Sequence, residues 1–196
     1  MERIKYLEAV KMQVEPKIFT HSLALEACME GLYNYFKTEN KLNIDEPLLE
    51  EWKIAGLTHD IDYSGEYKEF HPNMTKIVFD KYGLELSETV HDIIKSHAPS
   101  LTGKQPHNKA EWSIFCADSL MGLISAVAYV YPSKKLSEVK VSSVLKRFLK
   151  EPKFAAGTRR DEIALCANSD GLDLSLEKFI EICLISMQGI ATEIGL

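Results

Sequence analysis

Hydrophobic residues recur along most of the chain at the three- and four-residue spacing of amphipathic helices, whereas the alternation expected of strands is nearly absent. Proline and glycine fall mostly between these periodic segments, where they interrupt regular structure. The pattern therefore predicts an all-α fold. The predicted helices cover residues 3–12, 16–38, 47–60, 72–82, 86–98, 110–131, 136–150, 161–167 and 174–194.

Three of the predicted helices carry a metal-competent residue on their apolar face. His21 continues a stripe made by Ile18, Leu25, Cys28, Leu32 and Tyr35, and His59 continues one made by Leu48, Trp52 and Ala55. Asp118 lies between Ile114 and Met121 on the most apolar helix. Asp60 is about 100° further round the helix than His59, so both reach one ion only if the helix ends there. Tyr63-Ser64-Gly65 indicates such an end.

Inward-facing imidazoles and carboxylates are costly unless they are paired or bind a cation. A single histidine on an apolar face is more often a hydrogen-bonded core residue than a metal ligand. Three helices that each direct such a residue inward are harder to explain in that way. Two imidazoles and two carboxylates would form a mixed nitrogen and oxygen site, which suits one or two ions of Mn, Fe, Co, Ni, Zn or Mg.

Four further histidines differ in their predicted environment. His97 lies on the apolar stripe of Leu86, Val90, Ile93 and Ile94, at the C-terminal end of that helix, and therefore faces the core. His71 precedes Pro72 at a predicted helix start, so it is either a helix cap or a group that leans toward the site. His91 falls on the polar side of its helix, and His107 lies in the polar loop 101–108, where a surface position is the default.

The order His21, then His59-Asp60, then Asp118 resembles the HD-domain superfamily of metal-dependent phosphohydrolases. The matching segments are Thr20-His21-Ser22-Leu23-Ala24, Gly56-Leu57-Thr58-His59-Asp60-Ile61 and Cys116-Ala117-Asp118-Ser119-Leu120. The resemblance implies a helical bundle that holds ions between its helices, with Asp60 able to bridge two of them. His71 and His97 look like the two extra ligands of members that bind two metals.

The resemblance covers about residues 18–131. It implies a single HD-type domain over 1–196, with a metal-site core at about 18–131 and a C-terminal helical extension at about 132–196. The chain departs from the family where many members have Gly-Lys after His-Asp-Ile, because Asp62-Tyr63 stands there. Ala98-Pro99-Ser100-Leu101 also lacks the Gly-Tyr-Pro signature of the subgroups that cleave cyclic dinucleotides. The tail looks like that of a compact group of HD proteins whose substrates are largely unassigned.

The resemblance favours hydrolysis of a small phosphoester or nucleotide, in which a metal lowers the pKa of water so that hydroxide attacks phosphorus. His59 and Asp60 are the catalytic pair in this interpretation. An anionic substrate needs nearby cations. Lys146 and Arg159 are the first candidates for binding it, and Lys68 and Arg160 are further ones. Solvated surface charge is the alternative for each of them. Glu66 and Glu69 could relay protons to the leaving oxygen; only their closeness in sequence to His59 and Asp60 favours this role.

Two other functions remain open from the sequence. Some HD proteins with the two-metal histidine set resemble di-iron oxygenases, and iron content with oxygen consumption would identify that class. A module that binds a nucleotide or a partner and keeps a metal for stability is the other alternative. The intact ligand set argues against it, because a pure binder needs no open coordination position.

Composition and charge limit the kinds of molecule that the protein is expected to bind and the compartment in which we expect it. The net charge of −6 and the pI near 5.6 argue against general binding to nucleic acid or anionic membranes. The longest apolar stretch, from Leu120 to Tyr131, is too short to span a bilayer. The start of the chain lacks the features of a signal peptide, and the four cysteines are scattered through apolar helical stretches. We expect a cytoplasmic protein with free thiols, whereas substrate, native metal and oligomeric state stay open.

Overall fold

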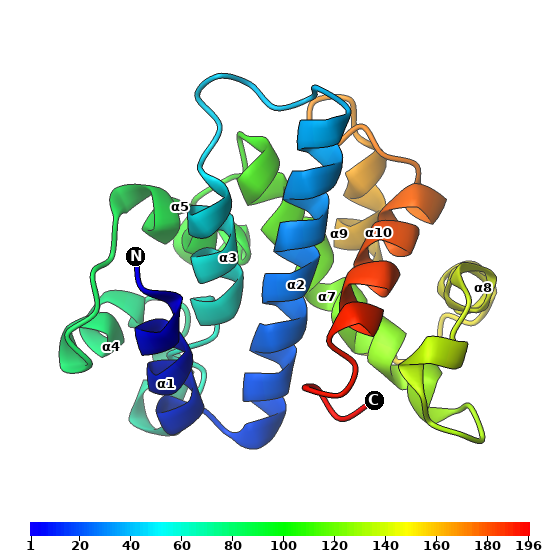
Figure 1. Cartoon of the computed structure of the whole chain (residues 1–196), viewed down its shortest axis with the longest axis horizontal. Helices are drawn as coiled ribbons and strands as arrows, with labels where there is room; N and C mark the ends of the chain where they lie inside the picture. Colours follow the sequence, from blue (N-terminus) through cyan, green and yellow to red (C-terminus); the bar gives the residue numbers. More distant parts are fainter.

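A computed structural model describes all 196 residues, and its regular elements are all helices (Figure 1). The α-helices are α1 (Arg3–Gln13), α2 (Pro16–Thr38), α3 (Leu49–Thr58), α4 (Thr75–Lys81), α5 (Glu88–Ser96), α6 (Pro99–Thr102), α7 (Lys109–Tyr129), α8 (Val141–Lys150), α9 (Arg160–Ala164) and α10 (Leu176–Gly189). Three short 3-10 helices are η1 (Gly65–Phe70), η2 (Leu136–Glu138) and η3 (Leu165–Ala167). The predicted all-α fold class is confirmed.

Helix α2 is the centre of the arrangement and packs against α3, α7 and α10 (Figure 1). Pro16 occupies its first turn, where a missing N–H costs nothing. Its apolar stripe, which includes Leu25, Leu32 and Phe36, is fully buried. Because His21 precedes this stripe by one turn, the packing of α2 also determines where His21 lies.

Helices α2 and α3 approach closely at Gly56, which lies one turn before His59. A Cβ atom there would stand 3.0 Å from the Cα of Glu26 and 3.0 Å from the Cγ of Met29. The Glu26 contact is with backbone, which cannot rotate away as a side chain can. Glycine at this position therefore allows α3 to lie against α2 and keeps His59 near His21.

We expect Gly56→Val to lower the free energy of unfolding by roughly 2 kcal/mol, because it overpacks this contact. Gly189→Val is the matched control, since Gly189 is also helical and has no atom near its would-be Cβ. Urea unfolding of both variants measures the difference. Equal stability of the two variants would contradict the tight contact between α2 and α3.

Several predicted boundaries differ from the structure. The helix predicted at 136–150 is two elements, η2 and α8, and the side-chain Nε2 of Gln188 donates to the carbonyl oxygens of Leu136 in η2 and Val139 just after it. Residues 64–70, predicted as loop, contain η1. The predicted helix at 72–82 begins only at Thr75, so Pro72 does not occupy its first position. The helix predicted at 161–167 is α9 followed directly by η3, which ends at Ala167, whereas the helix predicted at 174–194 ends early, at Gly189.

Helix α7 begins well before the apolar stretch from Leu120 to Tyr131. Over 21 residues, Lys109–Tyr129, it is long and apolar enough to cross a membrane by length and composition. Of its most apolar 18-residue window, 61% is buried inside the structure. Packing among the other helices thus accounts for the apolar character of α7.

The C-terminal segment packs against the earlier helices. Phe179, Ile180 and Leu184 of α10 belong to the same hydrophobic cluster as Leu25 of α2 and Leu120 of α7. Helices α8 and α9 both contact α7. The segment between them therefore runs past Asp118, which lies midway along α7.

Candidate metal centre

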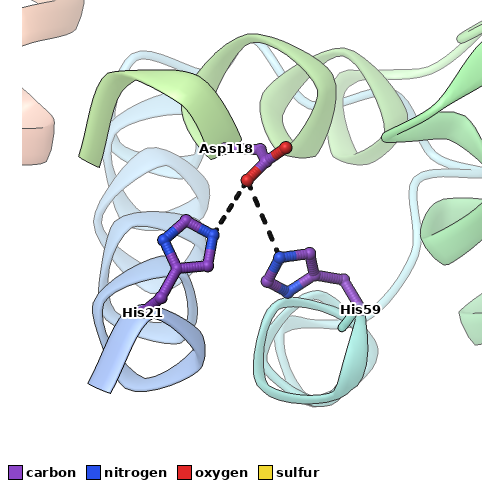
Figure 2. Close-up of side chains that lie close together, drawn as sticks. All are labelled: His21, His59 and Asp118. Atoms are coloured by element: carbon purple, nitrogen blue, oxygen red, sulfur yellow. Dashed lines mark hydrogen bonds and ion pairs between the residues drawn. The ribbon is translucent and has the colours of Figure 1, made fainter. Parts of the chain in front are cut away.

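Three helices bring His21, His59 and Asp118 together in the interior, although these residues are far apart in sequence (Figure 2). Asp118 directs its carboxylate from the middle of α7 toward the two histidines. Its Oδ1 lies 2.9 Å from the Nε2 of His21 and 3.7 Å from the Nε2 of His59. His59 follows the last residue of α3 and is fully buried.

Asp60 joins this group to a second one. Its Oδ2 lies 3.4 Å from the Nε2 of His59 and 4.0 Å from the Nε2 of His21. Its Oδ1 lies 3.4 Å from the Nε2 of His71 and 4.0 Å from the Nε2 of His97. The two oxygens of one carboxylate thus face two separate pairs of imidazoles, and all six residues predicted as metal ligands lie in one cluster.

Hydrogen bonds orient three of the four imidazoles. The Nδ1–H of His59 donates to the carbonyl oxygen of Gly56 at 2.9 Å, and that of His97 donates to the carbonyl oxygen of Ile94. The Nδ1–H of His71 donates to Asp62 Oδ1 at 2.6 Å. These partners assign the proton to Nδ1 in each ring and turn Nε2 toward Asp60. Histidines that bind metals use the same arrangement, in which the other ring nitrogen donates to a carbonyl or a carboxylate.

Two features of the cluster fit a bound cation. The Nε2 of His59 is buried and has no hydrogen-bond partner of adequate geometry, which is rare for a buried polar atom. The Nε2 atoms of His71 and His97 lie 3.1 Å apart. Because both rings already donate through Nδ1, this contact needs either a second proton on one ring or a cation that accepts both lone pairs. The donor set of four imidazole nitrogens and two carboxylates matches divalent transition metals.

The charges in the cluster shift several pKa values in the metal-free protein. Burial of His59 disfavours its charged form, but the carboxylates of Asp60 and Asp118 outweigh burial and raise its pKa to about 10. Burial also opposes ionisation of the two aspartates, yet the neighbouring histidines lower the pKa of each below its ordinary value. For His97, burial and the charge of His59 lower the pKa to about 4. The cluster therefore holds two carboxylates and a neutral His97 at neutral pH.

Asp62 supports the cluster from outside, a role that the sequence analysis did not assign to it. It is fully buried, and its Oδ2 accepts a hydrogen bond of 2.8 Å from the N–H of Met74 while its Oδ1 holds His71. This contact fixes the turn before α4, whose N-cap is Met74, so His71 caps the C-terminal end of η1 and not the start of α4. The only sequence signal was an acidic residue where the resembling family has glycine.

An open cleft of about 360 Å³ gives access to the centre. Its walls include the proposed ligands Asp60, His71, His97 and Asp118, together with Arg159 and Glu162. Arg159 comes from the segment before α9, and its Nη2 donates to Asp118 Oδ2 at 2.6 Å. Asp118 therefore uses one oxygen toward the histidines and the other toward Arg159. About half of the Arg159 side chain stays exposed, so the guanidinium also faces the cleft.

Lys146, predicted to bind substrate, does not line the cleft. Val144 and Phe148 bury one face of α8, and Lys146 points from the opposite face. Its exposed ammonium group lies 3.8 Å from the carboxylate of Glu151. The periodicity of α8 could have excluded Lys146, because a residue two positions from each buried neighbour lies about 200° away.

The remaining charged candidates lie at the rim of the cleft or beyond it. Arg160 donates to the backbone carbonyls of Phe148, Glu151 and Phe154, so it holds the segment after α8. Lys68 lies 5.1 Å above the ring of Tyr63, a residue that lines the cleft. Glu66 and Glu69 are exposed on η1 and do not line the cleft. His91 and His107 are outside the cluster, as predicted.

The chain matches no family model, no curated protein and no solved structure. The geometry of the cluster and the chemistry of its residues therefore carry the functional argument.

Proposed function

We propose that the chain binds one or two divalent transition-metal ions in the six-residue cluster and hydrolyses a small phosphoester or nucleotide. His21, His59 and Asp118 would hold one ion, and His71 with His97 would hold a second, with Asp60 between them. The order of these residues resembles that of the HD-domain superfamily, and we propose that the chain is a member. The division of the two Asp60 oxygens between the two histidine pairs is the observation that supports this most strongly.

The residues around the cluster suit a phosphoester. A divalent ion supplies Lewis acidity, which makes water a nucleophile at neutral pH and stabilises charge on a phosphoryl group. Arg159 holds Asp118 through Nη2 and can donate its remaining N–H groups to phosphate oxygens in the cleft. Glu162 accepts from the Nε of Arg159 and fixes the guanidinium plane. Asp62 keeps the ring of His71 directed at Asp60.

Metal binding should release a proton from the cluster. In the metal-free protein the pKa of His59 is about 10, so its Nε2 carries a proton at pH 7. A ligand nitrogen must be deprotonated, and protons therefore compete with the metal. Because the folded-state pKa is raised, this competition weakens metal binding as the pH falls, with affinity changing about tenfold per pH unit for each proton released.

Calorimetric titration of metal-free protein with Zn²⁺ or Mn²⁺ in two buffers of different ionisation enthalpy counts the released protons. We expect about one proton per ion bound at the His21, His59 and Asp118 site at pH 7. No release between pH 6 and 8 would mean that His59 Nε2 is not a ligand.

Elemental analysis of protein purified without added metal, combined with a phosphoester screen, tests the proposed function. The screen pairs alkyl phosphates and nucleotides with Mn²⁺, Co²⁺, Ni²⁺ and Mg²⁺. We expect bound transition metal and turnover that a chelator abolishes. Two irons with oxygen consumption would identify an oxygenase and overturn hydrolysis. A metal that is needed for folding, with no turnover of any phosphoester, would identify a binding module instead.

A further inference from the structure

A groove adjoins the metal cluster and runs along α7. Its first part, of about 380 Å³, adjoins the cleft at Asp118 and Arg159. Its second part, of about 220 Å³, adjoins the first at His21 and Gly122. Both parts share residues with the cluster, and the ion pair between Arg159 and Asp118 lies at the boundary between the cleft and the groove. A molecule bound at the metal centre would extend into this groove past that ion pair.

Two helices supply the groove with residues at regular helical spacing. On α7, Asp118, Gly122, Ser125 and Tyr129 follow one another at intervals of four, three and four residues and so form one face. On α2, Lys17 lies one turn before His21 and lines the far part. From Asp118 to Tyr129 the helix rises roughly 16 Å. This length greatly exceeds what a phosphate group alone occupies.

Gly122 has no packing reason to be glycine. It lies inside α7, where glycine is the least favourable residue except proline. A Cβ built on Gly122 would meet no atom within 4 Å, so no neighbouring helix requires its small size. The space that a side chain would fill belongs to the groove itself, because Gly122 lines both of its parts.

We propose that this groove binds the leaving group of the phosphoester and that Gly122 keeps it open. The preferred substrate is then an elongated phosphomonoester with an aromatic or heteroaromatic end. Leu196 provides an apolar side chain, Tyr129 provides a ring, and Ser125 provides a hydroxyl group. This inference rests on the proposed hydrolase function.

Three alkyl phosphates with similar leaving-group chemistry test the groove: ethyl phosphate, 2-(2-naphthyl)ethyl phosphate and phosphocholine. We expect wild-type kcat/KM to be at least tenfold higher for the naphthyl ester than for either of the others. Gly122→Leu should reduce this preference at least tenfold, and Gly122→Ala should reduce it less. Gly189→Leu is the matched control, because it adds the same side chain at a helical glycine with open space outside the groove.

Binding of the corresponding non-hydrolysable phosphonates, measured by calorimetry, gives a readout that is independent of turnover. Gly122→Leu should weaken binding of the naphthyl phosphonate at least tenfold more than binding of the ethyl phosphonate, with the metal content of the protein unchanged. An equal loss of affinity for both phosphonates, or equal wild-type kcat/KM for all three esters, would overturn the proposed role of the groove while leaving the hydrolase function intact. A wild-type protein that hydrolyses no phosphoester would overturn both.

Discussion

Asp60→Ala should lose its bound metal and reduce phosphoester turnover by more than the roughly hundredfold that marks the upper end for residues supporting a metal ligand. Asp60 is the one residue whose two oxygens face both histidine pairs, at 3.4 Å from His59 and 3.4 Å from His71. Its removal takes a ligand from each proposed ion. It also removes the charge that does most to raise the pKa of His59.

The helices should remain folded in this variant, because Asp60 follows α3 and its carboxylate faces only the cluster. Circular dichroism and thermal unfolding check the fold, and elemental analysis with steady-state kinetics checks the site. Asp80→Ala serves as a control, since Asp80 is exposed on α4. Asp60→Asn keeps the volume but has one oxygen and no charge, so it should also lose metal. Full retention of metal and activity in either Asp60 variant would refute the site.

Asp62→Asn should reduce turnover about 10- to 100-fold, the range found when a partner of a metal ligand is changed. Asp62 accepts from two donors, His71 Nδ1 and the N–H of Met74. An asparagine has a single carbonyl oxygen, so its NH₂ group would face one of these donors. His71 would then lose its fixed orientation or the turn before α4 would shift.

Asp62 acts through His71, so its effect should fall on one half of the cluster. We expect the metal content to fall from two equivalents toward one, while the ion held by His21, His59 and Asp118 stays bound. Metal titration followed by competition with a chelator distinguishes the two ions. Loss of both ions together, or an unchanged content of two, would contradict a role in positioning His71.

Periodicity predicted the inward-facing residues of the regular helices. His21, Asp118 and His97 lie on apolar faces of segments long enough to show a repeat; His97 is buried, and the side chains of His21 and Asp118 are largely buried. The same reasoning was weaker at segment ends. Leu48, assigned to the apolar stripe that leads to His59, is an exposed residue that precedes α3. Hydrophobic spacing describes a face of a helix and says little about where the helix begins.

Residues outside the helices depended on tertiary contacts. His71 precedes a proline that was expected to open a helix, but in the structure that helix begins only at Thr75. The hydrogen bond from His71 to Asp62 directs the His71 ring at the cluster. Arg159 and Lys146 looked alike in sequence, as cations in a polar tail. The packing of α8 and α9 against α7 places Arg159 on Asp118 and leaves Lys146 in solvent.

The amino-acid sequence by itself determined that the chain is helical and that His21, His59, His97 and Asp118 face inward, because both follow from local spacing along each helix. The tertiary structure decided how the two oxygens of Asp60 are shared, which cation stands at the cleft and where the groove beyond Asp118 runs. Those features depend on distances between segments up to a hundred residues apart, and such distances are set by the packing of α2, α3 and α7 and by the close contact at Gly56.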